Sequence, residues 1–148
     1  MPFADQRIRP IAICVFRNRG RILAIEGHDP TKDETFYRPV GGALRFGERS
    51  VDALHREVAE ELEVELCEPV LLGVLENLFT FDGAPGHEIV FVYDGKLPAP
   101  TLYGQPTVTG IESDGQPFTA VWREPEWFTP GRPPLYPDGL AELLGQQP

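Results

Sequence analysis

Apolar runs rich in β-branched residues alternate with turn residues along the first third of the chain. Residues 10–16 (PIAICVF) and 21–26 (RILAIE) are two such runs, separated by the turn-forming segment RNRG. This pattern predicts a β-hairpin. The polar residues 28–34 predict a loop, and residues 36–40 predict a short strand that leads into a pair of glycines.

A helical period replaces this pattern after residue 49. The apolar positions that recur at steps of three and four are Val51, Leu54, Val58 and Leu62. They form one stripe of a predicted helix. We expect Ser50 to cap its start, because a serine oxygen accepts from an otherwise unpaired backbone N–H, and Asp52 suits the positive end of the helix.

Two further apolar runs follow the helix and predict a second hairpin. Residues 70–81 (VLLGVLENLFTF) are too long and too rich in strand-forming residues for anything but a strand, which we expect to bend at Gly73. The turn residues DGAPG come next, and residues 87–93 (HEIVFVY) return as the paired strand.

The last third of the chain is less periodic. Residues 97–117 are rich in Pro, Gly and Thr and predict a long loop, a kind of segment that is usually functional or mobile. Residues 119–123 (TAVWR) predict one more strand, and residues 136–144 (YPDGLAELL) predict a closing helix. The expected inner face of that helix consists of Leu140, Leu143 and Leu144. Strands on both sides of a central helix, followed by a second helix, predict a mixed β-sheet between helices.

Composition and charge narrow the class of protein. The 148 residues indicate one domain over residues 1–148, and 41% hydrophobic with 24% charged residues is ordinary for a soluble globular protein. A net charge of −10 argues against binding of duplex nucleic acid or an anionic membrane, which attract basic surfaces. It leaves room for a small-molecule polyphosphate that arrives with its own metal ion.

The cysteines and the N-terminus indicate a cytoplasmic protein. Cys14 and Cys67 make neither a disulfide framework nor a zinc spacing, so we interpret both as reduced thiols. The first ten residues lack the apolar core of a signal peptide, and no apolar run is long enough to span a bilayer. The sequence is compatible with a monomer or a homodimer.

Three glutamates crowd together on another side of the central helix. Glu57, Glu60 and Glu61 recur at helical neighbour spacing, where like charges destabilise a helix by roughly 0.2–0.5 kcal/mol per pair. One interpretation is a solvated acidic face. The other is a site for a divalent cation, since Mg²⁺ prefers carboxylate and carbonyl oxygens and keeps positions open for phosphate.

The residues around these glutamates resemble a known family motif. Gly42, then five residues, Glu48, then seven residues and the run REVAEE at 56–61 resemble the Nudix box. The family pattern has a glycine two residues after that run, where this chain has Glu63. A helix commonly ends on a left-handed glycine, and a glutamate in that conformation costs about 1–2 kcal/mol.

The resemblance implies a fold, a reaction and a set of metal ligands. The fold is an α/β/α sandwich with a mixed sheet. The reaction is the Mg²⁺- or Mn²⁺-dependent hydrolysis of the pyrophosphate bond in a nucleoside diphosphate linked to another group, in which water attacks phosphorus. The implied ligands are Glu57, Glu60, Glu61 and the backbone carbonyl of Gly41, with one glutamate activating the water directly or through the metal.

Further residues take supporting roles by the same resemblance. Arg56 is expected to hold a box glutamate in place, and it belongs with Glu57 and Glu61 to the candidate catalytic set. Gly42 opens the box. Glu48 either closes the loop onto the helix or makes a plain contact with the positive helix end.

Residues outside the box complete the candidate site. Tyr37 and Arg38 are candidate substrate contacts, although a buried aromatic residue is the alternative interpretation of Tyr37. Members of the family often add one more carboxylate, for which Glu112 in the long loop is the first candidate and Glu88 its competitor. A solvated loop residue is the alternative for Glu112. Glu88 is otherwise a candidate substrate contact.

Two kinds of function remain open. The first is a metal-dependent pyrophosphohydrolase, and the second is a Nudix-fold nucleotide-binding module without turnover, which Glu63 alone supports in the sequence. The complete acidic set favours the enzyme, because a module without chemistry has no need of three clustered carboxylates. The leaving group of the substrate does not follow from residue spacing.

Overall fold

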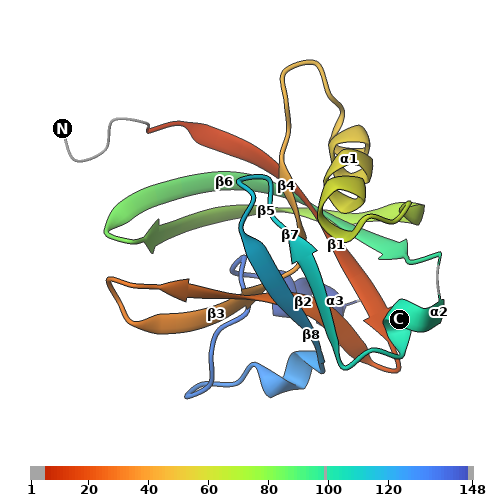
Figure 1. The fold of residues 1–148 in the computed structure, drawn as a ribbon. Coiled ribbons are helices and arrows are strands. Elements are labelled where there is room, and N and C mark those ends of the chain that lie inside the picture. The colour runs from red at the N-terminus through yellow and green to blue at the C-terminus, as the bar shows by residue number, and fades with distance from the viewer. Residues whose placement is uncertain (1–5, 99, 147–148) are drawn as a thin grey trace.

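The computed structural model describes residues 6–98 and 100–146 of the chain (Figure 1). Its strands are β1 (Ile8–Asn18), β2 (Arg21–Asp29), β3 (Glu34–Arg38), β4 (Val40–Ala43), β5 (Cys67–Phe81), β6 (Ala84–Lys96), β7 (Thr107–Ile111) and β8 (Pro117–Arg123). Its helices are α1 (Ser50–Leu62), α2 (Pro100–Tyr103), the short 3₁₀ helix η1 (Pro125–Trp127) and α3 (Leu140–Gly145). Among the described residues, no helix is long and apolar enough to cross a membrane.

The strands form a mixed sheet, as the sequence predicts. Their order is β5-β6-β1-β2-β8-β7, with β4 beside β1 and β3 beside β2. β1 and β6 run parallel, whereas β1 pairs antiparallel with β2 and β4. The remaining pairs, β2–β3, β2–β8, β5–β6 and β7–β8, are also antiparallel.

β1 and β2 diverge from the turn that joins them. They pair beside this turn, where Asn18 faces Arg21. Farther from the turn, β1 pairs with β4 and β2 pairs with β3. The sheet therefore has a first arm, β5-β6-β1-β4, and a second arm, β3-β2-β8-β7. The chain crosses from the second arm to the first at Pro39, between β3 and β4.

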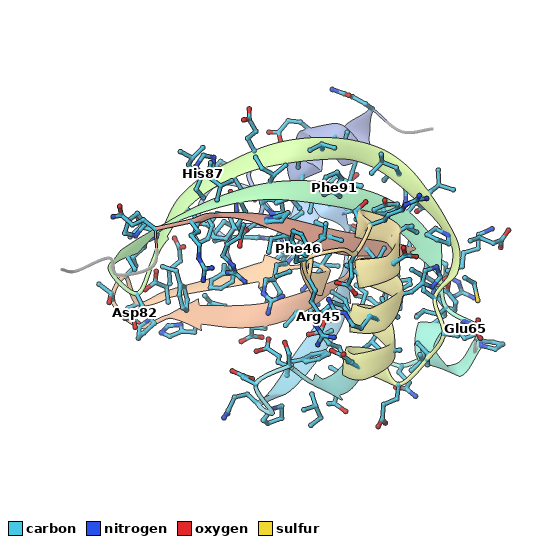
Figure 2. All side chains as sticks on the ribbon, turned by 90° about the horizontal axis from the view of Figure 1, so that it is seen from above. Arg45, Phe46, Glu65, Asp82, His87 and Phe91 are labelled. Atoms are coloured by element: carbon cyan, nitrogen blue, oxygen red, sulfur yellow. The ribbon has the colours of Figure 1, made fainter. Side chains whose placement is uncertain are left out.

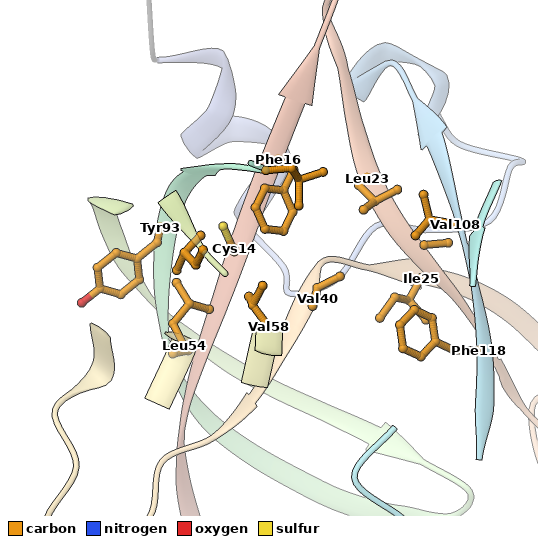
Figure 3. Packing of buried hydrophobic residues seen from close by; sticks show 14 of the residues in the cluster. Cys14, Phe16, Leu23, Ile25, Val40, Leu54, Val58, Tyr93, Val108 and Phe118 are labelled. Carbon is orange, nitrogen blue, oxygen red and sulfur yellow. The ribbon is translucent and has the colours of Figure 1, made fainter. Parts of the chain in front are cut away.

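β1 is buried on both faces, and this positions the layers of the fold. Successive side chains of a strand point to opposite faces, so alternate residues reach different helices. The cluster on the side of α1 includes Ala12, Cys14, Phe16, Leu54 and Val58 (Figure 3). The cluster on the side of α3 includes Ile11, Ile13, Val15, Leu140 and Leu144. The two helices cover opposite faces of the sheet, which confirms the predicted sandwich of helices around a mixed sheet.

The predicted loops at 28–34 and 97–117 are wrong in part. β2 continues to Asp29 and β3 begins at Glu34, because the two strands remain paired beyond the apolar run. The second predicted loop contains α2 and also β7, which pairs with β8. Pairing with a neighbouring strand orders these segments, and apolar periodicity does not reveal it.

The closing helix is shorter than predicted. It begins at Leu140 and not at residue 136, because Gly139 takes a left-handed conformation with φ of 90° that interrupts a helix. Leu140 and Leu144 are buried, whereas Leu143 is partly buried against the same cluster.

The predicted serine cap of α1 is also wrong. The helix begins at Ser50, and the extended residue Arg49 occupies the N-cap position. The Ser50 hydroxyl lies 2.6 Å from the hydroxyl of Tyr93 and therefore links the start of the helix to β6.

The C-terminus of α1 has the expected left-handed ending although a glutamate occupies the position. Glu63 has φ 57° and ψ 34°, and its backbone N–H donates to the carbonyl oxygen of Ala59 at 3.1 Å. This conformation is disfavoured for a residue with a Cβ atom.

Replacing Glu63 with glycine should therefore leave the free energy of unfolding unchanged or raise it by up to about 1 kcal/mol, because relieved strain offsets the wider unfolded ensemble. Chemical denaturation of both proteins measures the difference. Glu65→Gly is the matched control: this exposed residue lies in the segment after the helix, and glycine there should cost about 0.5–1 kcal/mol. A clear loss of stability in Glu63→Gly would contradict the strain.

Candidate functional site

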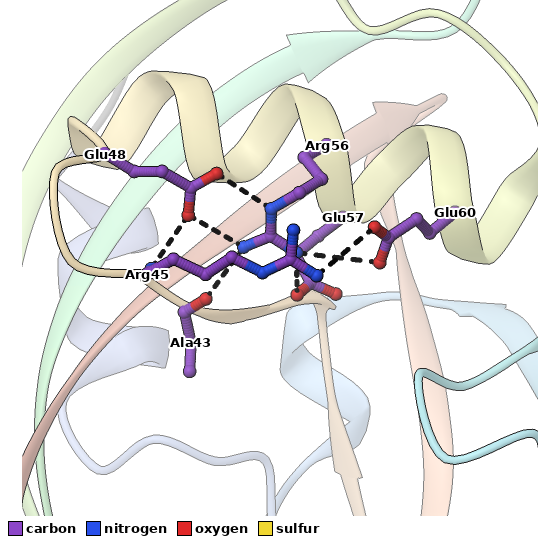
Figure 4. Close-up of polar contacts among 6 residues, drawn as sticks. All are labelled: Ala43, Arg45, Glu48, Arg56, Glu57 and Glu60. Carbon is purple, nitrogen blue, oxygen red and sulfur yellow. Dashed lines mark hydrogen bonds and ion pairs between the residues drawn. The ribbon is translucent and has the colours of Figure 1, made fainter.

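The Arg56 side chain joins the loop before α1 to the helix and to β4 (Figure 4). Its Nε and Nη2 atoms donate to the two carboxylate oxygens of Glu48 at 2.8 and 2.9 Å. Nη2 also donates to the carbonyl oxygen of Ala43 at 3.0 Å, and Nη1 donates to Glu57 Oε1 at 2.8 Å. One guanidinium group thus positions a carboxylate of the helix relative to β4.

Glu48 completes the closure of the loop. Its Oε1 atom accepts a second bond from the backbone N–H of Arg45 at 2.8 Å. The hydrogen bonds from Arg56 and then from Arg45 lower the pKa of Glu48 to about 2. Of the two interpretations of Glu48, this geometry supports the closing of the loop onto the helix.

Glu57 and Glu61 point inward from α1 and are 4% and 3% exposed. Within the described part of the chain, Glu57 Oε2 and Glu61 Oε1 are buried without a hydrogen-bond partner. A Cβ atom on Gly42 would overlap the Glu57 carboxylate, so the glycine makes room for this acid against β4. Buried carboxylate oxygens without hydrogen-bond partners are costly, so this pair is suited to contact with a cation.

The electrostatics of Glu61 support the same conclusion. Burial, the largest effect, together with the charges of Glu57 and Glu112, raises the pKa of Glu61 to about 8. The positive charge of Arg38 and a hydrogen bond from the backbone N–H of Gly41 act in the opposite direction and do not prevail. A divalent cation beside Glu61 would stabilise its ionised form.

Glu60 shares Arg56 with Glu57 but is more exposed than the two inward glutamates. Its side chain is 40% exposed, and its carboxylate lies 3.5 Å from Arg56 Nη1 and 3.8 Å from Arg45 Nη2. In the described residues, no group of three or more His, Cys, Asp or Glu side chains is close enough together to hold a metal ion. The structure brings Glu57 and Glu61 together and places Glu60 outside this pair.

A cleft lies beside the inward glutamates and has two compartments. The inner compartment has a volume of about 570 Å³, and its lining includes Gly41, Gly42, Arg56, Glu57 and Glu61. The outer compartment has a volume of about 770 Å³, and its lining includes Phe36 and Phe81. The residues that line both compartments are Arg9, Arg38, Asn77, Glu88, Glu112 and Tyr136.

Arg38, Glu88 and Glu112 thus lie where the sequence places candidate contacts. Arg38 Nη2 donates to Glu112 Oε1 at 2.7 Å. Glu88 Oε1 accepts a bond from the Asn77 side-chain amide at 3.4 Å, and Glu88 Oε2 lies 3.9 Å from Arg9 Nη1. Each of the two candidate carboxylates outside the box therefore faces the cleft with a cationic neighbour.

Tyr37 lies elsewhere in the described structure. Its side chain is buried against the rings of Trp127 and Phe128, and its hydroxyl donates to Glu26 Oε2 at 3.3 Å. Because β3 side chains alternate, Arg38 faces the cleft while its neighbour Tyr37 packs in the core. The geometry gives Tyr37 the structural role that is the alternative to substrate contact.

Sequence reasoning missed Arg9, Asn77 and Tyr136. They come from β1, β5 and the segment before α3, and only the folded chain brings them together. Asn77 has one sequence signal, because it is a neutral polar residue inside the apolar run of residues 70–81. Its 5% exposure in an edge strand agrees with a position facing the cleft.

Three solved structures have folds similar to that of this chain. A MutT NUDIX hydrolase from Burkholderia pseudomallei has a TM-score of 0.66 and 19% identity, over 95% of this chain and 98% of that chain. The E. coli ORF135 protein gives 0.58 and 20%, over 98% and 94%. A NUDIX hydrolase from Nitrosomonas europaea gives 0.56 and 18%, over 82% and 75%. At these identities the likeness shows the fold. No protein with a curated description matches the chain.

A family model described as the NUDIX domain matches residues 6–141, which is most of the chain. The matched residues include the closed loop at Glu48 and the inward glutamates of α1. This protein belongs to the Nudix family.

Proposed function

We propose that the protein hydrolyses a pyrophosphate bond in a nucleoside diphosphate linked to another group, using Mg²⁺ or Mn²⁺. The pair Glu57 and Glu61 carries this proposal. Each is buried beside the cleft with one oxygen that has no hydrogen-bond partner among the described residues. Such oxygens are the ligands that hard divalent cations prefer, and family membership supports a hydrolase.

The inner compartment fits a divalent cation. Glu57 Oε2 and Glu61 Oε1 would hold it, with the backbone carbonyl of Gly41 as a further ligand. Glu60, at the rim beside Arg56, and Glu112, across the cleft, are additional candidates. When bound, the ion neutralises the charge of the polyphosphate and polarises the phosphorus that water attacks.

The residues of the chain supply orientation and proton transfer. Arg9 and Arg38 line both compartments, where guanidinium groups bind phosphate oxygens well. Glu57 or Glu61 activates the attacking water, either as a general base or through the ion that it would hold. Arg56 positions Glu57 through the 2.8 Å bond to Oε1 and leaves Oε2 available for either role.

The alternative of a binding module without turnover has little support. Glu63 is its sequence evidence, and this residue takes the left-handed ending expected of the glycine in the family pattern. We further propose that the chain forms one domain, because β1 contributes to both core clusters. The free thiols of Cys14 and Cys67 support a cytoplasmic location.

Metal binding should stabilise the folded protein. Addition of Mg²⁺ or Mn²⁺ should raise the melting temperature, since a ligand at 100 times its Kd adds about 2.7 kcal/mol to the free energy of unfolding. Glu57→Gln and Glu61→Gln should each reduce this shift, whereas the exposed control Glu65→Gln should retain it. Differential scanning calorimetry measures the shifts. A wild-type melting curve that is indifferent to both metals would contradict the site.

Glu57→Gln should reduce turnover by about 10²–10⁴, because it removes a metal ligand or a base while keeping the volume of the side chain. Phosphate release from a panel of nucleoside triphosphates, dinucleoside polyphosphates and nucleotide sugars, with and without Mg²⁺, gives the reference activity. Activity of Glu57→Gln within about threefold of wild type would place the chemistry elsewhere.

Stability without metal should fall as the pH rises. The pKa of Glu61 is about 8 in the folded protein against an ordinary value of 4.5, so the folded state holds this proton more tightly than the unfolded state. The stabilising contribution is complete below pH 4.5 and is lost as the pH rises through about 8. Denaturation in a chelator from pH 5 to 8 should show this fall, and Glu61→Gln should flatten it. An equal slope in both proteins would contradict the raised pKa.

A further inference from the structure

Two hairpins from different arms of the sheet contribute most of the lining of the outer compartment of the cleft. β2 and β3 belong to the second arm, and β5 and β6 belong to the first. The lining includes Gly27 and Phe36 from the β2–β3 hairpin and Phe79 and Phe81 from β5. The tips of the two hairpins lie side by side in Figures 1 and 2, and Asp82, labelled in Figure 2, marks the tip of the β5–β6 hairpin.

Asp29 connects the two tips from a buried position. Its side chain is 2% exposed. Its Oδ1 atom accepts bonds from the backbone N–H groups of Thr31 at 3.0 Å and Lys32 at 3.2 Å, within its own hairpin. Its Oδ2 atom accepts a bond from the backbone N–H of Asp82 at 3.2 Å, in the other hairpin, and lies 3.8 Å from Lys32 Nζ.

A second polar contact and a pair of aromatic rings join the same hairpins. The Thr31 hydroxyl donates to Asp82 Oδ1 at 2.8 Å. The rings of Phe36 and Phe81 meet edge to face with centroids 6.0 Å apart. We use the name hairpin clasp for the residues Asp29, Thr31 and Asp82. The clasp and the ring pair both bridge the two arms at the outer compartment.

The ionised state of Asp29 suits this role. Burial alone would raise its pKa, but the hydrogen bonds from the backbone of Lys32, Asp82 and Thr31 outweigh burial and lower it. A buried carboxylate without such donors would be costly. Asp29 therefore accepts bonds from both hairpins at once, which a neutral side chain of the same shape cannot do.

The two compartments offer different surroundings to a nucleotide. The inward glutamates of α1 and Arg56 line the inner compartment alone, so that compartment suits the polyphosphate and its metal. The aromatic rings of Phe36, Phe79 and Phe81 line the outer compartment alone, so that compartment suits the organic part. The separation of Phe36 from Phe81 depends on how closely the two hairpins are held.

We propose that Asp29 is a positioning residue that sets the width of the outer compartment and thereby the affinity for the organic part of a nucleotide substrate. The proposal rests on the proposed function, and it concerns a residue outside the Nudix box. Asp29 acts through the placement of Phe36 and Phe81 and takes no part in the reaction itself.

Asp29→Asn should remove the bond between the hairpins and keep the bonds within the β2–β3 hairpin. The amide oxygen can still accept from Thr31 and Lys32, so the turn within the β2–β3 hairpin is retained. The amide nitrogen then faces the Asp82 N–H and the Lys32 ammonium, so two donors meet and the bond between the hairpins is lost. The change preserves the volume of the side chain.

The experiment compares nucleotides with an inorganic probe. Kd and KM are measured for the four common ribonucleoside triphosphates, and Kd for inorganic tripolyphosphate, all with Mg²⁺. For the best nucleotide, Asp29→Asn should raise Kd and KM by about 5–20-fold, the equivalent of one lost hydrogen bond or more. The kcat value and the Kd of tripolyphosphate should stay within about twofold, because the inner compartment is unchanged.

Matched variants control for general damage to the fold. Thr31→Val removes the exposed hydroxyl of the clasp and should weaken nucleotide binding in the same direction, whereas Thr31→Ser should restore wild-type values. Asp33→Asn removes an exposed charge 3.2 Å from His28 within the same hairpin tip, at a residue outside the clasp, and should leave all constants unchanged. If Asp29→Asn does not fold, the nucleotide Kd values of the two Thr31 variants test whether the clasp sets nucleotide affinity.

The outcomes separate this inference from the proposed function. If the wild-type protein binds nucleotides without hydrolysing them, the proposed enzymatic function is wrong. The Kd values of the variants would still test the effect of the clasp on nucleotide affinity. Unchanged nucleotide Kd and KM values in Asp29→Asn and Thr31→Val would overturn the clasp alone. An equal loss of affinity for nucleotide and tripolyphosphate would also overturn it, because the effect would then extend beyond the outer compartment.

Discussion

The site depends on the contact between Arg56 and Glu48. In the loop between β4 and α1, the Glu48 carboxylate accepts bonds from Arg56 and from the backbone N–H of Arg45. The same guanidinium group donates to Ala43 and Glu57. A lysine has a single ammonium group and cannot present this fork of donors in several directions. Because the Arg56 side chain is 17% exposed, water and salt screen the contact less than they screen a surface ion pair. Helix, loop and strand therefore keep a common geometry.

Burial and arginine partners shift the pKa values of two acids of this motif in opposite directions. Glu48 has two bonds from Arg56, and its pKa is about 2. Glu61 is buried one helical turn beyond Glu57, with Arg38 as a weaker positive influence, and its pKa is about 8. The folded chain thus stabilises the ionised form of Glu48 and disfavours the ionised form of Glu61. Such opposite pKa shifts are typical of functional sites.

Sequence spacing predicted the parts of the structure that depend on local geometry. The apolar stripe of α1 follows from the helical period, and the left-handed ending at Glu63 follows from the family pattern, which has a glycine at that position. Ser50 does not cap the helix, because the Tyr93 hydroxyl of a distant strand lies beside it. The cleft was not predictable in full. Arg9 and Asn77 meet there because β1 and β5 both pair with β6 at Glu88, and Tyr136 joins them from the segment before α3; these long-range contacts have no local signature in the sequence.

The crossing of the chain at Pro39 has a mechanical consequence. Arg38 belongs to the second arm and Gly41 to the first, and Pro39 lies between their strands. The proline ring restricts its own φ angle and the backbone of the residue before it, so little rotation is available at this link. The two arms are therefore joined by a backbone link of restricted flexibility at Pro39, between β3 and β4. The bond from the Asp82 backbone N–H to Asp29 joins the same two arms a second time, at the hairpin tips.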